Sequence, residues 1–148
     1  MCLVVYMSSA RERPTIPWDE KEPRFHVKAD DPDSEKAQVH FSKPRVYYLG
    51  SDNGCGCGFR RETDYMIREA EELASKQDNQ KRLHDHVSNC LADEEFVELF
   101  SCWSGDEAEP IESRRDVELA DVISENFFFA ERQITRVFRH LGEPEKKR

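Results

Sequence analysis

The sequence predicts a single α+β domain in which a mixed sheet of about four or five strands packs against a two-helix block. Three observations lead to this fold class. Apolar, partly β-branched runs that are typical of strands occur at 3–7, 45–49 and 95–103. Apolar residues with helical spacing fill the segment 61–92. Because strands both precede and follow this helical segment, we expect one mixed sheet rather than a regularly alternating α/β fold.

The first quarter of the chain supports few regular elements. The run 3–7 is apolar at every position, which predicts a strand buried on both faces. Pro14, Pro17 and Pro23 exclude regular structure from the following segment, and we expect Ile16 and Trp18 to anchor this loop to the core. A short edge strand is expected at 25–27, and an acidic surface loop at 29–36.

The remaining elements follow from the same patterns. The strand 45–49 leads directly into a glycine-rich loop, and the strand 95–103 has apolar residues on both faces, which places it centrally. The helical stripe of 61–92 changes phase near Asp78 and Asn79, so we expect two helices, or one helix with a break there. We expect a polar loop at 106–116 and a short helix at 119–123. The segment 126–138 fits a strand or a helix, and its aromatic and β-branched residues favour the strand.

The domain is expected to span 1–142, followed by a flexible charged tail at 143–148. The 148 residues carry a formal net charge of −9, which disfavours binding to nucleic acids and to anionic membranes. No apolar run approaches the roughly 18–20 residues that span a bilayer, and the first residues lack the charged start of a signal peptide. We therefore expect a cytoplasmic protein whose five cysteines are free thiols, metal ligands or redox groups.

The most informative stretch is S-D-N-G-C-G-C-G-F-R at 51–60, where two cysteines alternate with glycines. Cys55 and Cys57 could place two thiolates on one soft metal ion, such as zinc or another soft transition metal. Cys2 begins one predicted strand and Cys102 ends another, so these two are the candidates for further sulfur ligands. The signal is incomplete, because zinc sites more often use Cys-x₂₋₄-Cys and need four ligands.

Three alternatives remain open for the same loop. Cys55 and Cys57 could act as a redox-responsive dithiol, with Arg60 and Arg61 favouring the thiolate form. The backbone of the glycines, together with the two arginines, could instead bind an anionic substrate of a small enzyme; these candidates are Gly54, Gly56, Gly58, Arg60 and Arg61. In the third alternative the loop is only a shaped turn in a non-enzymatic interaction or regulatory module.

Several segments together resemble a family of small bacterial proteins that has no known activity. The resemblance rests on M-C-L-V-V-Y-M-S-S, P-T-I-P-W-D-E, F-S-K-P-R-V-Y-Y-L-G-S, V-E-L-F-S-C-W-S-G-D-E, F-F-F-A-E-R and, most specifically, G-C-G-C-G-F. It covers 1–137 and implies a single domain, with no substrate, partner or catalytic residue. The leading hypothesis is therefore a small cytoplasmic protein with a Cys-Gly-Cys thiol site that binds a soft metal ion or responds to redox state. Whether the protein is an enzyme is left open.

Overall fold

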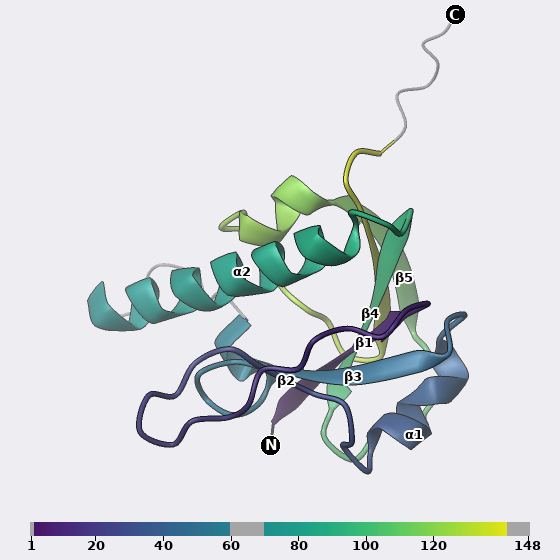
Figure 1. Ribbon diagram of the computed structural model, residues 1–148, viewed down its shortest axis with the longest axis horizontal. Helices are drawn as coiled ribbons and strands as arrows, with labels where there is room; N and C mark the ends of the chain where they lie inside the picture. The colour runs from purple at the N-terminus through teal and green to yellow at the C-terminus, as the bar shows by residue number, and fades with distance from the viewer. Residues whose placement is uncertain (1, 60–69, 142–148) are drawn as a thin grey trace, which may run out of the picture.

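The computed structural model describes residues 2–59 and 70–141, which form one six-stranded sheet with helices on its faces (Figure 1). The strand order is β2-β3-β1-β4-β6-β5, and all neighbours are antiparallel except β5 and β6. The strands are β1 (Leu3–Ser9), β2 (His26–Lys28), β3 (Arg45–Gly50), β4 (Phe96–Trp103), β5 (Ser113–Glu118) and β6 (Gln133–Phe138). The predicted α+β fold with a mixed sheet is confirmed, with six strands in place of four or five.

The helices are α1 (Ser34–Ala37), α2 (Ala70–Cys90) and the 3₁₀ turns η1 (Gln38–His40), η2 (Gly56–Phe59) and η4 (Leu119–Ile123). The predicted helix break near Asp78 and Asn79 is wrong, because α2 runs through both residues without interruption. Asn79 and Gln80 are buried and face inward, where Asn79 bonds to Asp52 in the loop after β3 and Gln80 bonds to the turn η4. These two polar side chains interrupt the apolar stripe on the inward-facing side of α2. In the sequence, this interruption looks like a change in the phase of the helical pattern.

Two segments that we expected to be loops contain parts of regular elements, and one expected strand is shorter than predicted. The loop expected at 106–116 already contains the start of β5, whose polar sequence suits a strand at the edge of the sheet. The loop expected at 29–36 contains most of α1. The strand favoured at 126–138 is confirmed only for its second half, as β6, whereas Phe127 and Phe129 are buried without belonging to a strand.

The sheet has a core on each face, because alternate residues of β1 point to opposite sides. Leu3, Val5 and Met7 belong to the first core, together with Leu83 and Val87 of α2. The helix α2 and the turn η4 are in contact and lie over this face (Figure 1). The second core contains Val4, Tyr6, Phe100, Cys102, Ile134 and Ala37 of α1. This confirms that β1 is buried on both faces and that β1 and β4 are central.

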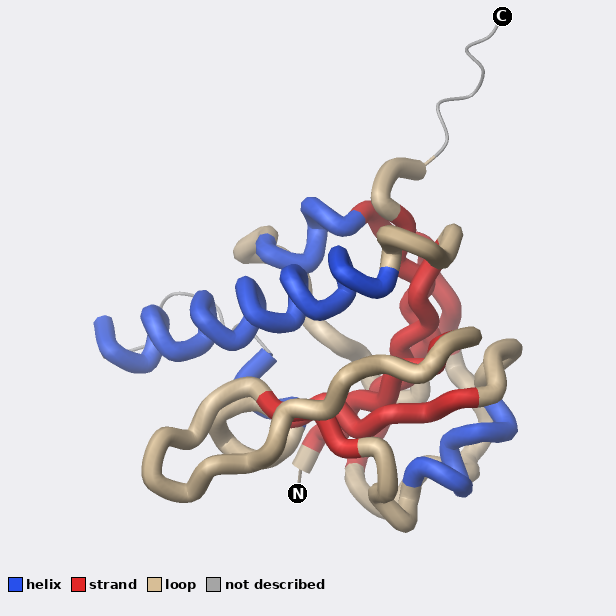
Figure 2. The backbone as a smooth tube through the Cα atoms, viewed as in Figure 1, coloured by secondary structure: helices blue, strands red, loops and turns tan. Residues whose placement is uncertain are grey.

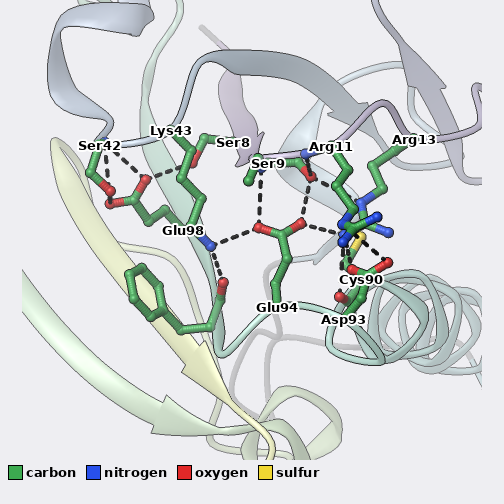
Figure 3. Close-up of polar contacts among 12 residues, drawn as sticks. Ser8, Ser9, Arg11, Arg13, Ser42, Lys43, Cys90, Asp93, Glu94 and Glu98 are labelled. Carbon is green, nitrogen blue, oxygen red and sulfur yellow. Dashed lines mark hydrogen bonds and ion pairs between the residues drawn. The ribbon is translucent and has the colours of Figure 1, made fainter.

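The long loop between β1 and β2 projects beyond the sheet, and its course is drawn in tan in Figure 2. Ile16 anchors this loop by an isolated antiparallel bridge to Val27 and by packing against the first core. At the start of the loop, the buried carboxylate of Glu94 accepts hydrogen bonds from Ser9 Oγ at 2.5 Å and from Lys43 Nζ at 2.8 Å (Figure 3). It also pairs with Arg13. One carboxylate therefore joins β1, the loop after it, the segment before β3 and the start of β4.

Candidate metal centre

Three cysteines lie together at one end of the sheet. The sulfur atoms of Cys2, Cys55 and Cys57 are all within 4.8 Å of one another. Cys2 precedes β1, and the other two belong to the loop and the η2 turn that follow β3. Because β1 and β3 are antiparallel neighbours, the start of β1 lies beside the end of β3. The topology of the sheet thus brings together cysteines that are more than fifty positions apart in sequence.

The loop that carries Cys55 and Cys57 is closed around the side chain of Ser51. Ser51 Oγ donates to the carbonyl oxygen of Cys55 at 2.6 Å and accepts from the amide of Gly58 at 3.0 Å. The Ser51 amide donates to the same Cys55 oxygen at 2.8 Å, and the Gly54 amide donates to Ser51 O at 3.0 Å. Protein groups alone therefore fix the shape of this loop.

Two glycines let the loop adopt this shape and approach β1. Gly54 has φ +87°, in the left-handed region that side chains disfavour. A Cβ on Gly56 would lie 2.8 Å from Val5 Cγ2 and 3.0 Å from the carbonyl oxygen of Leu3, which is too close for a real atom. Only glycine therefore permits the backbone between the two cysteines to pack directly on β1.

The three sulfurs have different surroundings. Cys55 is buried, Cys57 is half-buried and Cys2 is exposed. The amide of Leu3 donates to Cys57 Sγ at 3.4 Å. Burial raises the pKa of the Cys55 thiol to about 12; the amide of Cys57 opposes this change, and the neighbouring thiols of Cys57 and Cys2 add to it. Without an ion, Cys55 is therefore a protonated thiol at neutral pH.

Aromatic side chains line the neighbourhood of the loop. Tyr48 Oη donates to the carbonyl oxygen of Gly54 at 2.8 Å. The ring of His26 lies 6.1 Å from that of Tyr48 and 4.7 Å from that of Trp18. Trp18 Cη2 would lie 3.9 Å from a Cβ on Gly54, so the indole is next to the cysteine loop. Trp18 is 39% exposed and does not pack against the first core, so the expectation that it anchors the loop to the core is wrong, although Ile16 does so. Its indole can still report on changes in the loop.

The structure brings together Cys2, Cys55 and Cys57 among the predicted sulfur ligands, but Cys102 is not part of the group. Cys102 is fully buried in the second core, where it pairs across the strands with Val4. The reason is the register: the amide of Ser104, two residues later, bonds to the carbonyl oxygen of Cys2 at 2.7 Å. The sheet thus places Ser104, rather than Cys102, opposite Cys2.

The predicted anion site is placed only in part. Arg60 and Arg61 lie outside the described residues. The amides of Gly54 and Gly58 donate to Ser51 within the loop. These two amides are already paired, so they do not point at an external anion.

Sequence reasoning missed two residues that support the site, Ser51 and Asn79. Asn79 of α2 donates to Asp52 Oδ1 at 2.9 Å and to the carbonyl oxygen of Gly58 at 3.3 Å, and it accepts from the Asp52 amide at 3.2 Å. The apparent phase change near Asn79 was the available signal, since it marked a polar residue on the buried side of a helix. No pattern around Ser51 distinguishes it from an ordinary turn residue.

The described helices include none long and apolar enough to cross a membrane. The function of the three-cysteine group has to be inferred from its geometry, because comparison of the chain with protein-family models, curated proteins and solved structures finds no match.

Proposed function

We propose that this protein binds a soft metal ion, such as zinc or another soft transition metal, through Cys2, Cys55 and Cys57. The observation that supports the proposal is the convergence of three sulfur atoms within 4.8 Å of one another. Thiolates bound to one ion at about 2.3 Å stand roughly 4 Å apart, so only small side-chain movements are needed. Thiolate sulfur is the ligand type that selects soft ions.

The surroundings of the sulfurs support the same proposal. A metal-bound thiolate keeps its negative charge, which amide donors stabilise. The amide of Leu3 already donates to Cys57 Sγ at 3.4 Å. The loop that carries Cys55 and Cys57 is held by Ser51 and Asn79, so two of the three ligands are preorganised for an ion.

Elemental analysis of the reduced, untagged chain, purified without chelator and then loaded with Zn²⁺, tests the proposal. We expect about one equivalent of metal per chain, and loss of binding in Cys55→Ser and Cys57→Ser. Cys102→Ala is the matched control, because it removes a buried thiol outside the group and should leave the metal content unchanged. A content below about one-tenth of an equivalent before and after loading would contradict the proposal.

A reversible disulfide within the same group is a second candidate function. The observation that favours it is the exposed Cys2 beside two further sulfurs, since an accessible thiol next to a resolving thiol suits oxidation by peroxide. Two thiols would lose two protons and two electrons, and the peroxide would be reduced. Intact mass after peroxide treatment tests this: loss of two hydrogens, recovered by a reductant and absent in Cys2→Ser, supports a disulfide. A mass that does not change contradicts it.

A further inference from the structure

The three sulfurs of the group are anchored to very different degrees. Cys55 is buried, and Cys57 packs against the first core and accepts the Leu3 amide. Both belong to the loop that is closed by Ser51. Cys2 is exposed and precedes the first residue of β1. Two sulfurs are thus fixed by the fold, whereas the third lies at its surface.

The fixed pair is held in position by contacts within the protein. Hydrogen bonds from Ser51 and Asn79 close the loop, and Gly56 packs its backbone against Val5 and Leu3. Structural zinc sites behave differently, because their four ligands are brought together by the ion and the domain unfolds without it. This group therefore differs from a structural site in that the protein forms the loop by itself.

Among residues 2–59 and 70–141, the group has three ligands and no fourth. In the described part of the chain, no histidine, carboxylate or fourth cysteine joins the three sulfurs within the same distance. Soft divalent ions take four ligands in a tetrahedral arrangement, and sites that exchange a ligand keep one position open. Of the three cysteines, Cys2 is the exposed one.

We infer that the group is an exchange site, in which Cys55 and Cys57 hold a soft metal ion while Cys2 is displaced by an external thiol that begins to carry the ion away or delivers it. This inference rests on the proposed function above. The external ligand is recognised by its thiol, whether it is a small thiol or a cysteine of another protein.

The exchange step is a substitution at the metal. In the first substitution the incoming thiol sulfur forms a bond to the ion, and the bond between the ion and Cys2 Sγ breaks. Departure of the ion takes two more such substitutions, in which further ligands of the acceptor replace Cys55 and Cys57, and delivery of the ion is the reverse. The proton of the incoming thiol ends on Cys2, so charge and atoms balance. No electrons are transferred, and the oxidation state of the ion does not change.

Transfer of Zn²⁺ from the loaded, reduced full chain to a chromophoric chelator tests the inference. The transfer rate is measured without added thiol, with glutathione, and with a short peptide that contains one cysteine. Comparing the last two rates distinguishes a small thiol from a cysteine of another protein as the external ligand. Cys2→Ser is the informative variant, because an exposed residue outside the strands can be changed without disturbing the core. Cys102→Ala serves as the control.

We expect each effective thiol to accelerate transfer from the unchanged chain by at least about tenfold, since it supplies the ligand that replaces Cys2. In Cys2→Ser, we expect the affinity for Zn²⁺ to fall by about 10–100-fold. Transfer to the chelator should already be fast without thiol, and an added thiol should increase its rate only slightly. Cys102→Ala should behave like the unchanged chain.

Three results would overturn the inference. The first is a chain that binds Zn²⁺ but transfers it to the chelator at the same rate with and without either thiol. The second is a Cys2→Ser variant that binds and releases the ion like the unchanged chain. The third is a chain that unfolds when the ion is stripped, which is the behaviour of a structural site. In the first and third cases the proposed function still stands. The second result would also remove Cys2 from the proposed ligand set, and a chain that binds no Zn²⁺ contradicts the proposed function as a whole.

Discussion

Replacing Ser51 by alanine should weaken both the fold and the metal site, because one buried hydroxyl closes the cysteine loop. The substitution removes the bond to the Cys55 carbonyl oxygen, which keeps its second donor, the Ser51 amide. It also removes the acceptor of the Asn53 amide at 3.2 Å and of the Gly58 amide at 3.0 Å. Asn53 is exposed, so water can replace its partner, whereas Gly58 is buried and its amide is left unpaired.

The expected loss of unfolding free energy follows from these contacts. The unpaired buried amide costs about 1–3 kcal/mol, and the lost bond to Cys55 adds roughly 1 kcal/mol. A total of about 2–4 kcal/mol lowers Tm by roughly 5–12 °C in a domain of this size. Because Ser51 also positions the backbone of Cys55, affinity for Zn²⁺ should fall by about 10–100-fold.

Thermal unfolding followed by circular dichroism, and Zn²⁺ competition with a chelator, measure the two effects. Ser104→Ala is the control, because the exposed Ser104 hydroxyl makes no hydrogen bond with any described residue while its amide is retained. The reasoning is refuted if Ser51→Ala lowers Tm by less than about 2 °C and leaves the affinity unchanged.

Three further predictions concern other parts of the molecule. Burial alone would raise the pKa of Glu94, but hydrogen bonds from Lys43, Ser9 and Arg13 outweigh it and lower the pKa from 4.5 to about 2. The ionised carboxylate therefore contributes up to about 3 kcal/mol to the free energy of unfolding. This contribution is present above pH 4.5 and is lost as the pH falls toward 2. Urea unfolding should show a smaller loss of stability between pH 7 and pH 3 in Glu94→Gln than in the unchanged chain, and equal losses would contradict this. Gly56→Ala should lower metal affinity and Tm, measured as above, because the added Cβ would clash with Val5 and Leu3. Gly105→Ala is the comparison, because Gly105 has φ +103° and an added Cβ there meets no atom within 4 Å, so this variant introduces backbone strain without a clash. Metal loading should change the fluorescence of Trp18, and a change that persists in Trp18→Phe, in which only Trp103 remains, would exclude Trp18 as its source.

The sequence predicted most of the sheet because strand residues carry their own signal. The fully apolar start of β1 and both apolar faces of β4 required central positions, and both strands occupy them. Where this signal was absent, prediction failed. β5 has no apolar pattern, because an edge strand with polar residues is stabilised by its neighbour β6 rather than by its own burial.

The candidate site shows the same division between local and distant information. Cys55 and Cys57 were recognisable from a loop of ten residues, since the glycines and cysteines are adjacent in sequence. The choice between Cys2 and Cys102 depended on strand register, which the sequence did not determine. Asn79 contacts the loop only because α2 crosses that end of the sheet, so its role required the three-dimensional structure.

The central position of β1 has a consequence for the order in which the chain can fold. Leu3 pairs with Trp103 on one side, whereas on the other side Val5 pairs with Leu49, so β1 gains its two neighbours at very different stages of synthesis. Every sulfur of the candidate site belongs to residues 2–57, the part that emerges with the first partner. The thiol cluster can therefore form on a nascent antiparallel pair of β1 and β3, while the opposite edge of β1 is not yet covered by β4 and is open to wrong pairing. Ligand capture at this stage would favour the correct first pairing before the rest of the sheet exists.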